Sequence, residues 1–405
     1  MSQFAFDRGE LCVGGMRLSR LAERVGQTPF FAYDRALLRE CVAALRAALP
    51  PSVKLHYAMK ANPFGPVVSY MAGLVDGIDI ASAGELQIAL NAGAPTAEIS
   101  FAGPAKRASE LRQAAAAGVL INVESMREVK LLAAIGSEFG AAPRVAVRVN
   151  PDFELKGSGM KMGGGPKQFG VDVEQVPDLL RLIGEAGLAF EGFHLFAGSQ
   201  NLRAESICEA QQKSYELALR LAEHAPHPVC FLNLGGGFGI PYFPGERRLD
   251  LQPIGDNLAA ITERAGREMP QASLVIELGR YLVGEAGIYV ARIVDRKVSR
   301  GQVFLVTDGG LHHHLAASGN FGQVVRKNYP VTTSPWTGRD GNAVATEVAS
   351  VVGPLCTPLD LLADRMELPV AQEGDLVIVF QSGAYGASAS PQAFLGHPPC
   401  AEVLV

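Results

Sequence analysis

The sequence predicts an α/β protein made of a (β/α)8 barrel and a second, mainly β domain. Short β-rich runs alternate with longer segments of helical periodicity as far as Gly279. After Gly279, the segments between strand-like runs become rich in Gly, Pro and Ser. Strands that alternate with helices form parallel βα units, and eight such units match a barrel of about 250 residues. On this pattern alone, a doubly wound open sheet stays an alternative.

The expected elements follow one another regularly along the chain. The β-rich runs are Lys54–Lys60, Gly77–Ala81, Ile99–Ala102, Val119–Val123, Arg144–Val149, Phe190–Phe196, Phe231–Leu234 and Leu274–Leu278. Helical i, i+3, i+4 spacing of apolar residues occurs between them, for example in Ala83–Ala92, Ser109–Ala117 and Ser214–His224. The later strand-like runs are Ile288–Val294, Val303–Thr307, Glu347–Val352 and Asp375–Phe380. We expect the barrel over 28–280 and the β domain from 1–27 and 281–405.

Composition excludes several classes of protein. The 405 residues include 48% hydrophobic and 19% charged residues, which is typical of a globular chain. The net charge of −5 gives no overall nucleic-acid footprint, and no apolar stretch has the length of a membrane span. No signal-peptide pattern opens the sequence, and the six cysteines show no C-x-x-C spacing. We therefore expect a cytoplasmic protein with reduced thiols.

The first β-rich run ends in Lys60, and catalytic groups of barrels lie at the carboxyl ends of the strands. A lysine at the inner end of an apolar strand is costly to bury unless it is paired or used covalently. Such a lysine can form a Schiff base. The alternative is an ordinary solvated lysine just past the strand, and position alone favours that alternative.

The last three β-rich runs before the second domain all end in glycines. They finish in Gly198-Ser199-Gln200, Gly235–Gly239 and Gly279-Arg280. Backbone N–H groups without a neighbouring Cβ can hold a phosphate, and the loops after strands seven and eight are a usual phosphate site of barrels. Glu277, inside the last apolar run, needs a cation or a donor. It either pairs with a core cation or faces a protonated ring nitrogen.

The second domain offers weaker signals. Cys356 fits a packed thiol, and Tyr385 fits an ordinary loop tyrosine. The triplet His312-His313-His314 suggests a metal site, but consecutive side chains of a strand alternate between its faces. No acidic or cysteine ligand stands at a suitable spacing either, so we expect no metal.

Together these segments resemble a known family. Tyr-Ala-x-Lys-Ala-Asn, Gly-Ser-Gln, Gly-Gly-Gly-Phe-Gly, Glu-x-Gly-Arg, Gly-Pro-x-Cys and Gly-Ala-Tyr-Gly occur in this order. The pattern resembles the pyridoxal-phosphate (PLP)-dependent amino-acid decarboxylases of the alanine-racemase-like fold (fold type III), including diaminopimelate and ornithine decarboxylases. The resemblance runs from about Pro29 to the C-terminus.

The resemblance implies a role for each matching residue. Lys60 would bind PLP covalently, Glu277 would keep the pyridine nitrogen protonated, and Cys356 would donate a proton to the product carbon in the other subunit of a homodimer. Other residues would bind the cofactor, and these are Asp79, Arg148, Phe196, Ser199, Gly236, Gly237, Gly279, Arg280 and Tyr385. Candidate substrate residues are Arg280, His312, Asn320, Cys356 and Thr357.

Three departures from the family pattern bear on the substrate. Phe196 stands where a histidine usually stacks on the cofactor ring, and His194, two residues earlier, is as easily structural as functional. Thr357 replaces an acid that binds a distal amino group. No arginine occurs after the Asp308-Gly309-Gly310 motif before Arg326. A site for a charged distal end needs such groups, which argues against free diaminopimelate, ornithine and lysine.

The altered segments look closest to the exosortase-associated and glutamyl–acyl-carrier decarboxylases, which suggests a substrate tethered to an acyl-carrier protein. Alternatives are a decarboxylase of diaminopimelate or another free amino acid, an amino-acid racemase, and a non-catalytic PLP-binding regulator. Glu277 disfavours the racemase, because racemases of this fold place an arginine at the ring nitrogen. The glycine-rich stretch 157–165 suggests a lid, as a hypothesis.

Overall fold

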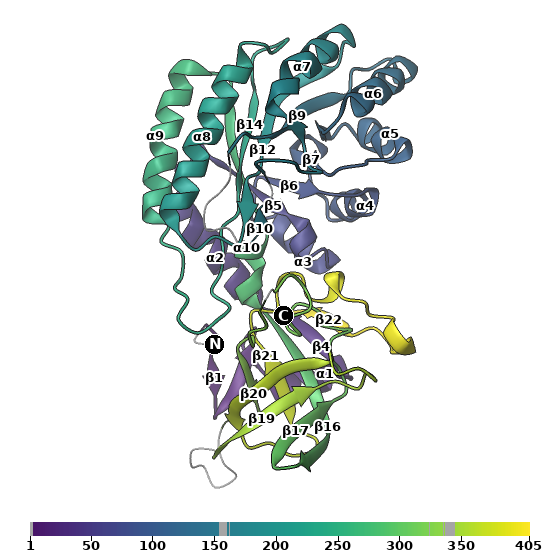
Figure 1. Ribbon diagram of the computed structural model, residues 1–405, viewed down its shortest axis with the longest axis vertical. Helices are drawn as coiled ribbons and strands as arrows, with labels where there is room; N and C mark the ends of the chain where they lie inside the picture. The colour runs from purple at the N-terminus through teal and green to yellow at the C-terminus, as the bar shows by residue number, and fades with distance from the viewer. Residues whose placement is uncertain (1–2, 154–159, 162, 324, 335, 337–344) are drawn as a thin grey trace. The chain divides into compact units, whose positions relative to one another are not determined.

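The computed structural model describes residues 3–153, 160–161, 163–323, 325–334, 336 and 345–405 (Figure 1). The chain divides into two compact units. The barrel unit comprises Cys41–Ile240 and Arg247–Tyr281, and the β unit comprises Met1–Glu40, Pro241–Glu246 and Leu282–Val405. Compared with the limits expected from the sequence, residues 28–40 and 241–246 fall in the β unit.

The barrel unit contains a closed ring of eight parallel strands. In chain order they are β5 (Lys54–Ala58), β6 (Gly77–Ile80), β7 (Ile99–Phe101), β8 (Leu120–Val123), β9 (Arg144–Asn150), β12 (Ala189–Leu195), β14 (Phe231–Gly236) and β15 (Ser273–Leu278). The pairing of β8 with β9 and of β15 with β5 closes the ring. This closure confirms the expected barrel and excludes the open sheet. Apolar side chains such as Leu120, Ala146 and Val275 fill its interior.

Helices lie on the outside of the strands (Figure 1). They are α2 (Arg35–Ala48), α3 (Gly65–Ala72), α4 (Ala83–Asn91), α5 (Ala108–Ala117), α6 (Met126–Phe139), α7 (Val176–Glu185), α8 (Ala204–Ala222) and α9 (Gln252–Glu268). The short α10 (Arg280–Val283) follows the end of β15. Their starts follow from local chemistry: Ser82 and Ser125 accept hydrogen bonds from backbone N–H groups three residues on, which caps α4 and α6. The segment expected as a helix at Ser214–His224 is the second half of the longer α8.

Short elements complete the barrel unit. The small strands β10 (Met160–Lys161) and β13 (Gly198–Ser199) pair with each other, and β11 (Val171–Asp172) pairs with β9. Single 3-10 turns span Met59–Ala61, Thr96–Glu98 and Val173–Gln175. Of the glycine-rich stretch 157–165, residues 157–159 and 162 lie outside the described residues. Within the described part, Gly164 N–H donates to Asn150 Oδ1 at 3.2 Å.

The β unit is mainly sheet. Its strands are β1 (Phe6–Asp7), β2 (Glu10–Val13), β3 (Met16–Arg17), β4 (Phe30–Tyr33), β16 (Gly287–Ser299), β17 (Gln302–Thr307), β18 (Val331–Thr333), β19 (Thr346–Val352), β20 (Leu361–Pro369), β21 (Leu376–Val379) and β22 (Ala401–Leu404). Helix α1 (Leu18–Val25) and 3-10 turns at Gly284–Ala286, Ala387–Ala389 and Phe394–Gly396 accompany them. The long β16 pairs with β4, β17 and β21. The four strand-like runs expected here are all strands.

Candidate active site

Polar side chains gather at the carboxyl ends of the barrel strands. Lys60 follows β5, Asp79 lies in β6, Arg148 in β9 and Glu277 in β15, while Phe196 follows β12. Parallel pairing places β15 beside β5 and β5 beside β6. The closed ring therefore brings together side chains that stand far apart in the sequence, at the end where barrels carry their active sites.

Lys60 lies in the 3-10 turn after β5, and its side chain is exposed. Its ammonium nitrogen Nζ lies 5.2 Å from the ring centroid of Phe196, within cation–π range. Phe196 itself is 9% exposed. The amine is thus accessible beside an aromatic face. Lys60 lies just past the strand, which is where the sequence analysis placed it in the alternative of an ordinary solvated lysine.

The glycines after β14 approach neighbouring backbone too closely for any side chain. A Cβ on Gly236 would lie 2.0 Å from the carbonyl oxygen of Glu277, and one on Gly237, whose φ is +74°, would lie 2.2 Å from that of Gly198. Ser199 follows Gly198 in β13. Gly279 is also enclosed, because its Cβ would lie 2.9 Å from the oxygen of Ala58. Only glycine permits this close approach to the backbone of Gly198 and Ser199.

Glu277 is a buried carboxylate with a buried imidazole beside it. His194 Nε2 lies 2.8 Å from Glu277 Oε2, and both residues are at most 5% exposed. Burial opposes ionisation of the carboxyl, but the charge and hydrogen bond of His194, with the charges of Lys60 and Arg148, outweigh it and hold the pKa of Glu277 below the usual range of a carboxyl. Glu277 therefore stays ionised at neutral pH, as a partner for a positive ring nitrogen must.

Arg148 is held by a buried carboxylate rather than by solvent. Its Nη1 donates to Glu124 Oε1 at 3.0 Å, and its guanidinium stacks 5.0 Å from the centroid of Phe169. Glu124 also accepts from the backbone N–H groups of Gly103 at 2.6 Å and Gly170 at 2.9 Å. Despite desolvation, the charges of Arg148 and Lys106 and the hydrogen bonds from Gly170 and Arg148 lower the pKa of Glu124.

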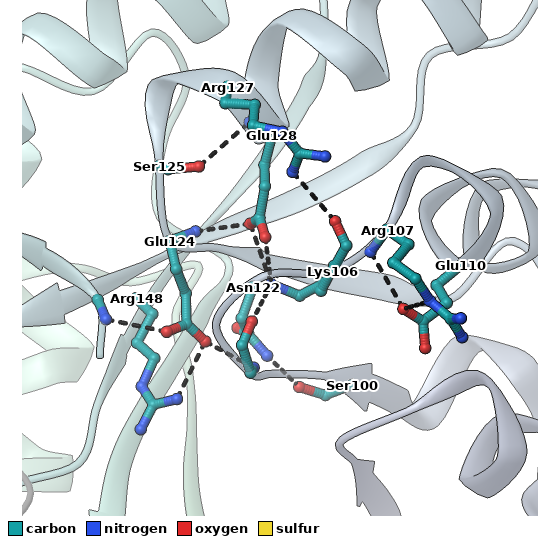
Figure 2. A network of polar contacts seen from close by, with 12 residues as sticks. Ser100, Lys106, Arg107, Glu110, Asn122, Glu124, Ser125, Arg127, Glu128 and Arg148 are labelled. Atoms are coloured by element: carbon teal, nitrogen blue, oxygen red, sulfur yellow. Dashed lines mark hydrogen bonds and ion pairs between the residues drawn. The ribbon is translucent and has the colours of Figure 1, made fainter. Parts of the chain in front are cut away.

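A second buried ion pair supports this one, as Figure 2 shows. Lys106 Nζ donates to both oxygens of Glu128, at 3.0 and 3.2 Å, and to the carbonyl of Gly103 at 2.8 Å. Glu128 Oε2 in turn accepts from the backbone N–H of Glu124 at 2.9 Å. The network therefore connects the ends of β7, β8 and β9 and fixes the backbone that carries Glu124.

Asp79 shares its carboxylate with a buried histidine. Its Oδ1 lies 3.1 Å from His56 Nδ1, and the charge and hydrogen bond of Asp79 outweigh burial and raise the pKa of His56. Its other oxygen, Oδ2, is buried and has no hydrogen-bond partner among the described residues. That oxygen is available to a further polar group.

The remaining predicted residues are dispersed. Arg280 is the first residue of α10, in the barrel unit. The others belong to the β unit: the Cys356 thiol is free and exposed, and Thr357 is half-buried and accepts from Leu359 N–H at 3.3 Å. Asn320 is exposed and donates to Ser318 Oγ at 2.8 Å.

Tyr385, also in the β unit, has a backbone φ of +53°, a conformation that non-glycine residues rarely adopt. Its ring centroid lies 6.3 Å from that of Phe321. The positive φ marks Tyr385 as a residue held in place by its surroundings.

The three histidines lie in a turn segment after β17, not in a strand, and all are buried. Burial lowers the pKa of His312 to about 4 and that of His314 to about 3. The rings of His312 and His313 are tilted against each other by 43°, with centroids 3.7 Å apart, and His314 Nε2 lies 2.9 Å from Ser382 Oγ. Across the described ranges, no group of three or more His, Cys, Asp or Glu is placed to hold a metal ion.

Sequence reasoning missed several polar residues around this site. Glu124 directly follows the fourth β-rich run, which was a usable signal, and Asn233 interrupts the apolar run Phe231–Leu234. The partnership of Lys106 with Glu128 had no sequence signal, because both lie in segments that look like ordinary solvated helix starts.

The strand ends fit PLP. Lys60 offers an accessible amine, Glu277 offers a charged carboxylate, and the glycines after β14 let the backbone of Gly198 and Ser199 approach closely. A (β/α)8 barrel with such a lysine, together with a mainly β unit, defines a fold type III PLP enzyme.

The comparisons with known proteins agree. The family model described as pyridoxal-dependent decarboxylase, pyridoxal binding domain, matches residues 35–284, and the chain belongs to this family. It is therefore a PLP-dependent carboxy-lyase. It is 38% identical to L-glutamyl-[BtrI acyl-carrier protein] decarboxylase of Niallia circulans over 93% of this chain and 89% of that protein.

Two diaminopimelate decarboxylases are also similar. That of Aquifex aeolicus is 33% identical over 98% of this chain and 91% of its own. The crystal structure of the Helicobacter pylori enzyme complexed with L-lysine superposes with a TM-score of 0.82 at 26% identity, covering 96% of this chain and 94% of that one. In the part of the chain that the structure describes, no helix has the length and apolarity to cross a membrane.

Proposed function

We propose that this decarboxylase acts on an amino acid tethered as a thioester to an acyl-carrier protein, with a glutamyl group as the first candidate. The observation that carries the proposal is the segment from Asp308 to Val325, which contains no arginine for a distal carboxylate. Arg326 donates instead to the carbonyls of Ser318 at 3.0 Å and Leu361 at 2.6 Å. A tethered substrate has no free distal carboxylate, and the relative from Niallia circulans is named for such a substrate.

In this proposal the barrel residues hold the cofactor. Lys60 binds it covalently, and the turn at Gly236 and Gly237 with Ser199 receives the phosphate. Glu277 keeps a proton on the ring nitrogen. Asp79 and Arg148, each fixed by a buried partner, support the ring, and Phe196 packs on it in place of a histidine. When bound, PLP withdraws electrons from the substrate Cα, which allows the bond to the carboxylate to break.

The protein then supplies a proton to the carbon that CO2 has left. We assign this step to Cys356, acting in the site of a second copy within a homodimer. The thiol is exposed and unpaired, as that role requires. All six cysteines are free thiols, which supports a reducing compartment, the cytoplasm.

CO2 release tests the substrate. The purified holoenzyme is incubated with glutamyl-carrier, free glutamate, lysine and diaminopimelate, with Lys60→Ala as the inactive control. We expect rapid release from the carrier-bound substrate alone. Fast release from free diaminopimelate would overturn the proposal and favour the activity of the Aquifex aeolicus relative.

Mixed subunits test the shared site. Lys60→Ala and Cys356→Ala proteins, each inactive alone, are mixed under conditions in which subunit exchange is demonstrated by labelled subunits. Hybrid dimers should regain part of the activity, since one of their sites has both residues. Complete exchange without regained activity would show that Cys356 does not act across a dimer.

A further inference from the structure

Two side chains of the described residues hydrogen-bond to the same oxygen of Glu277, Oε2. Besides His194 at 2.8 Å, Asn233 Nδ2 donates to Oε2 at 3.1 Å. The other oxygen, Oε1, accepts neither of these hydrogen bonds. Strand register explains the convergence, because His194 of β12 is directly paired with Asn233 of β14, and β14 is paired with β15, which carries Glu277.

The other polar atoms of His194 and Asn233 make few further hydrogen bonds. His194 Nδ1 is buried and has no hydrogen-bond partner among the described residues, so the ring's polar contact is the one with Glu277. The Asn233 side-chain oxygen, Oδ1, accepts a hydrogen bond from the backbone N–H of Gly235 at 2.8 Å. Asn233 therefore links the Glu277 carboxylate to the start of the glycine turn.

We propose that His194 and Asn233 are positioning residues, which hold the Glu277 carboxylate by Oε2 and leave Oε1 as the oxygen that faces the protonated ring nitrogen of PLP. This inference rests on the proposed role of Glu277. It also assigns separate tasks to two neighbours: Phe196 packs on the cofactor, whereas His194 acts only through Glu277.

Cofactor binding to the apoprotein separates this role from simple packing. The probes are PLP and its deaza analogue, in which C–H replaces the ring nitrogen. His194→Leu, which removes the donor, should weaken PLP binding by roughly tenfold to a hundredfold, the usual effect of losing a hydrogen bond to a charged group. Its affinity for the analogue should equal that of the wild type. His194→Gln, which keeps an N–H donor, should recover most of the PLP affinity.

Controls make each outcome decisive. Phe193→Leu, a buried change on the same strand, should not change the ratio of the two affinities. If His194→Leu does not fold, Asn233→Leu replaces it with the same expectation. The positioning role would be overturned if His194→Leu weakened the binding of both ligands equally, or of neither. Glu277→Gln is measured in parallel. If it weakens binding of PLP and of the analogue equally, the proposed role of Glu277 itself fails. If Glu277→Gln weakens PLP binding selectively and His194→Leu does not, only the role of His194 is overturned.

Discussion

Lys106→Met should destabilise the barrel unit more than any surface change. The Lys106 and Glu128 side chains are 1% and 2% exposed, and Lys106 Nζ makes three hydrogen bonds, of which two go to the carboxylate (Figure 2). Removing the lysine leaves a buried carboxylate without its cation. Breaking such a pair costs about 3–5 kcal/mol of unfolding free energy. Methionine is unbranched and only one atom shorter than lysine, so the main change is the loss of the charge with its hydrogen bonds.

Urea unfolding followed by far-ultraviolet circular dichroism measures this loss, because most helices belong to the barrel unit. The single tryptophan, Trp336, lies in the β unit, and its fluorescence provides an internal reference. Arg181→Met is the matched control: its side chain is 68% exposed and pairs with Asp178, itself 65% exposed, at the surface, where ion pairs contribute little.

The double variant Lys106→Met/Glu128→Met completes the cycle. Replacing both partners of a buried ion pair with apolar side chains is often nearly neutral, so the double variant should recover most of the lost stability. A loss below about 1 kcal/mol in Lys106→Met, or a double variant no more stable than the single one, would refute the assignment of Lys106–Glu128 as a buried support of the strand ends.

Three further predictions concern Gly237, His56 and Cys356. Gly237→Ala should weaken PLP binding by at least about tenfold, measured by equilibrium dialysis, because its Cβ would meet the oxygen of Gly198; Gly266→Ala, in open space on α9, is the control and should bind PLP normally. The pKa of His56 is raised above its ordinary 6.5, so its contribution to apoprotein stability is full below pH 6.5 and is lost as pH rises through the raised value. His56→Gln should flatten this part of the urea-midpoint profile against pH, and an unchanged profile would contradict the His56–Asp79 pairing. Cys356→Ala should keep the urea midpoint, because the thiol is exposed, while losing most CO2 release; normal turnover would remove Cys356 from the mechanism.

Local patterns revealed most of the barrel. All eight parallel strands were expected, because each is a short apolar run between helical segments. Their number favoured a closed barrel but left an open sheet possible, and the pairings of β8 with β9 and of β15 with β5 decide between the two. The strands of the β unit were harder to predict from the sequence. Strand β4 is only four apolar residues, and its partners β16 and β22 lie at distant positions in the chain. Strand β20, with Asp, Arg and Glu among its residues, lacks a clear apolar run.

For the site, too, the sequence indicated the residues of local motifs but not their distant partners. Motif residues such as Lys60 and Glu277 carry their own signals: a cation or carboxylate beside an apolar run. Their partners do not. His194 and Asn233 stand 83 and 44 residues from Glu277, and only the register of β12, β14 and β15 brings them to one oxygen. Periodicity identifies strands, but it does not give the register between them.

The central claim is that this enzyme removes a carboxyl group from an amino acid held on a carrier protein. Intact-mass spectrometry of a glutamyl-loaded acyl-carrier protein after incubation with the holoenzyme tests it directly, because it identifies the molecule that has lost the carboxyl group. We predict that the loaded carrier loses the mass of one CO2 with the wild type and stays unchanged with Lys60→Ala. An unchanged carrier in the presence of an enzyme that decarboxylates free diaminopimelate would contradict the claim.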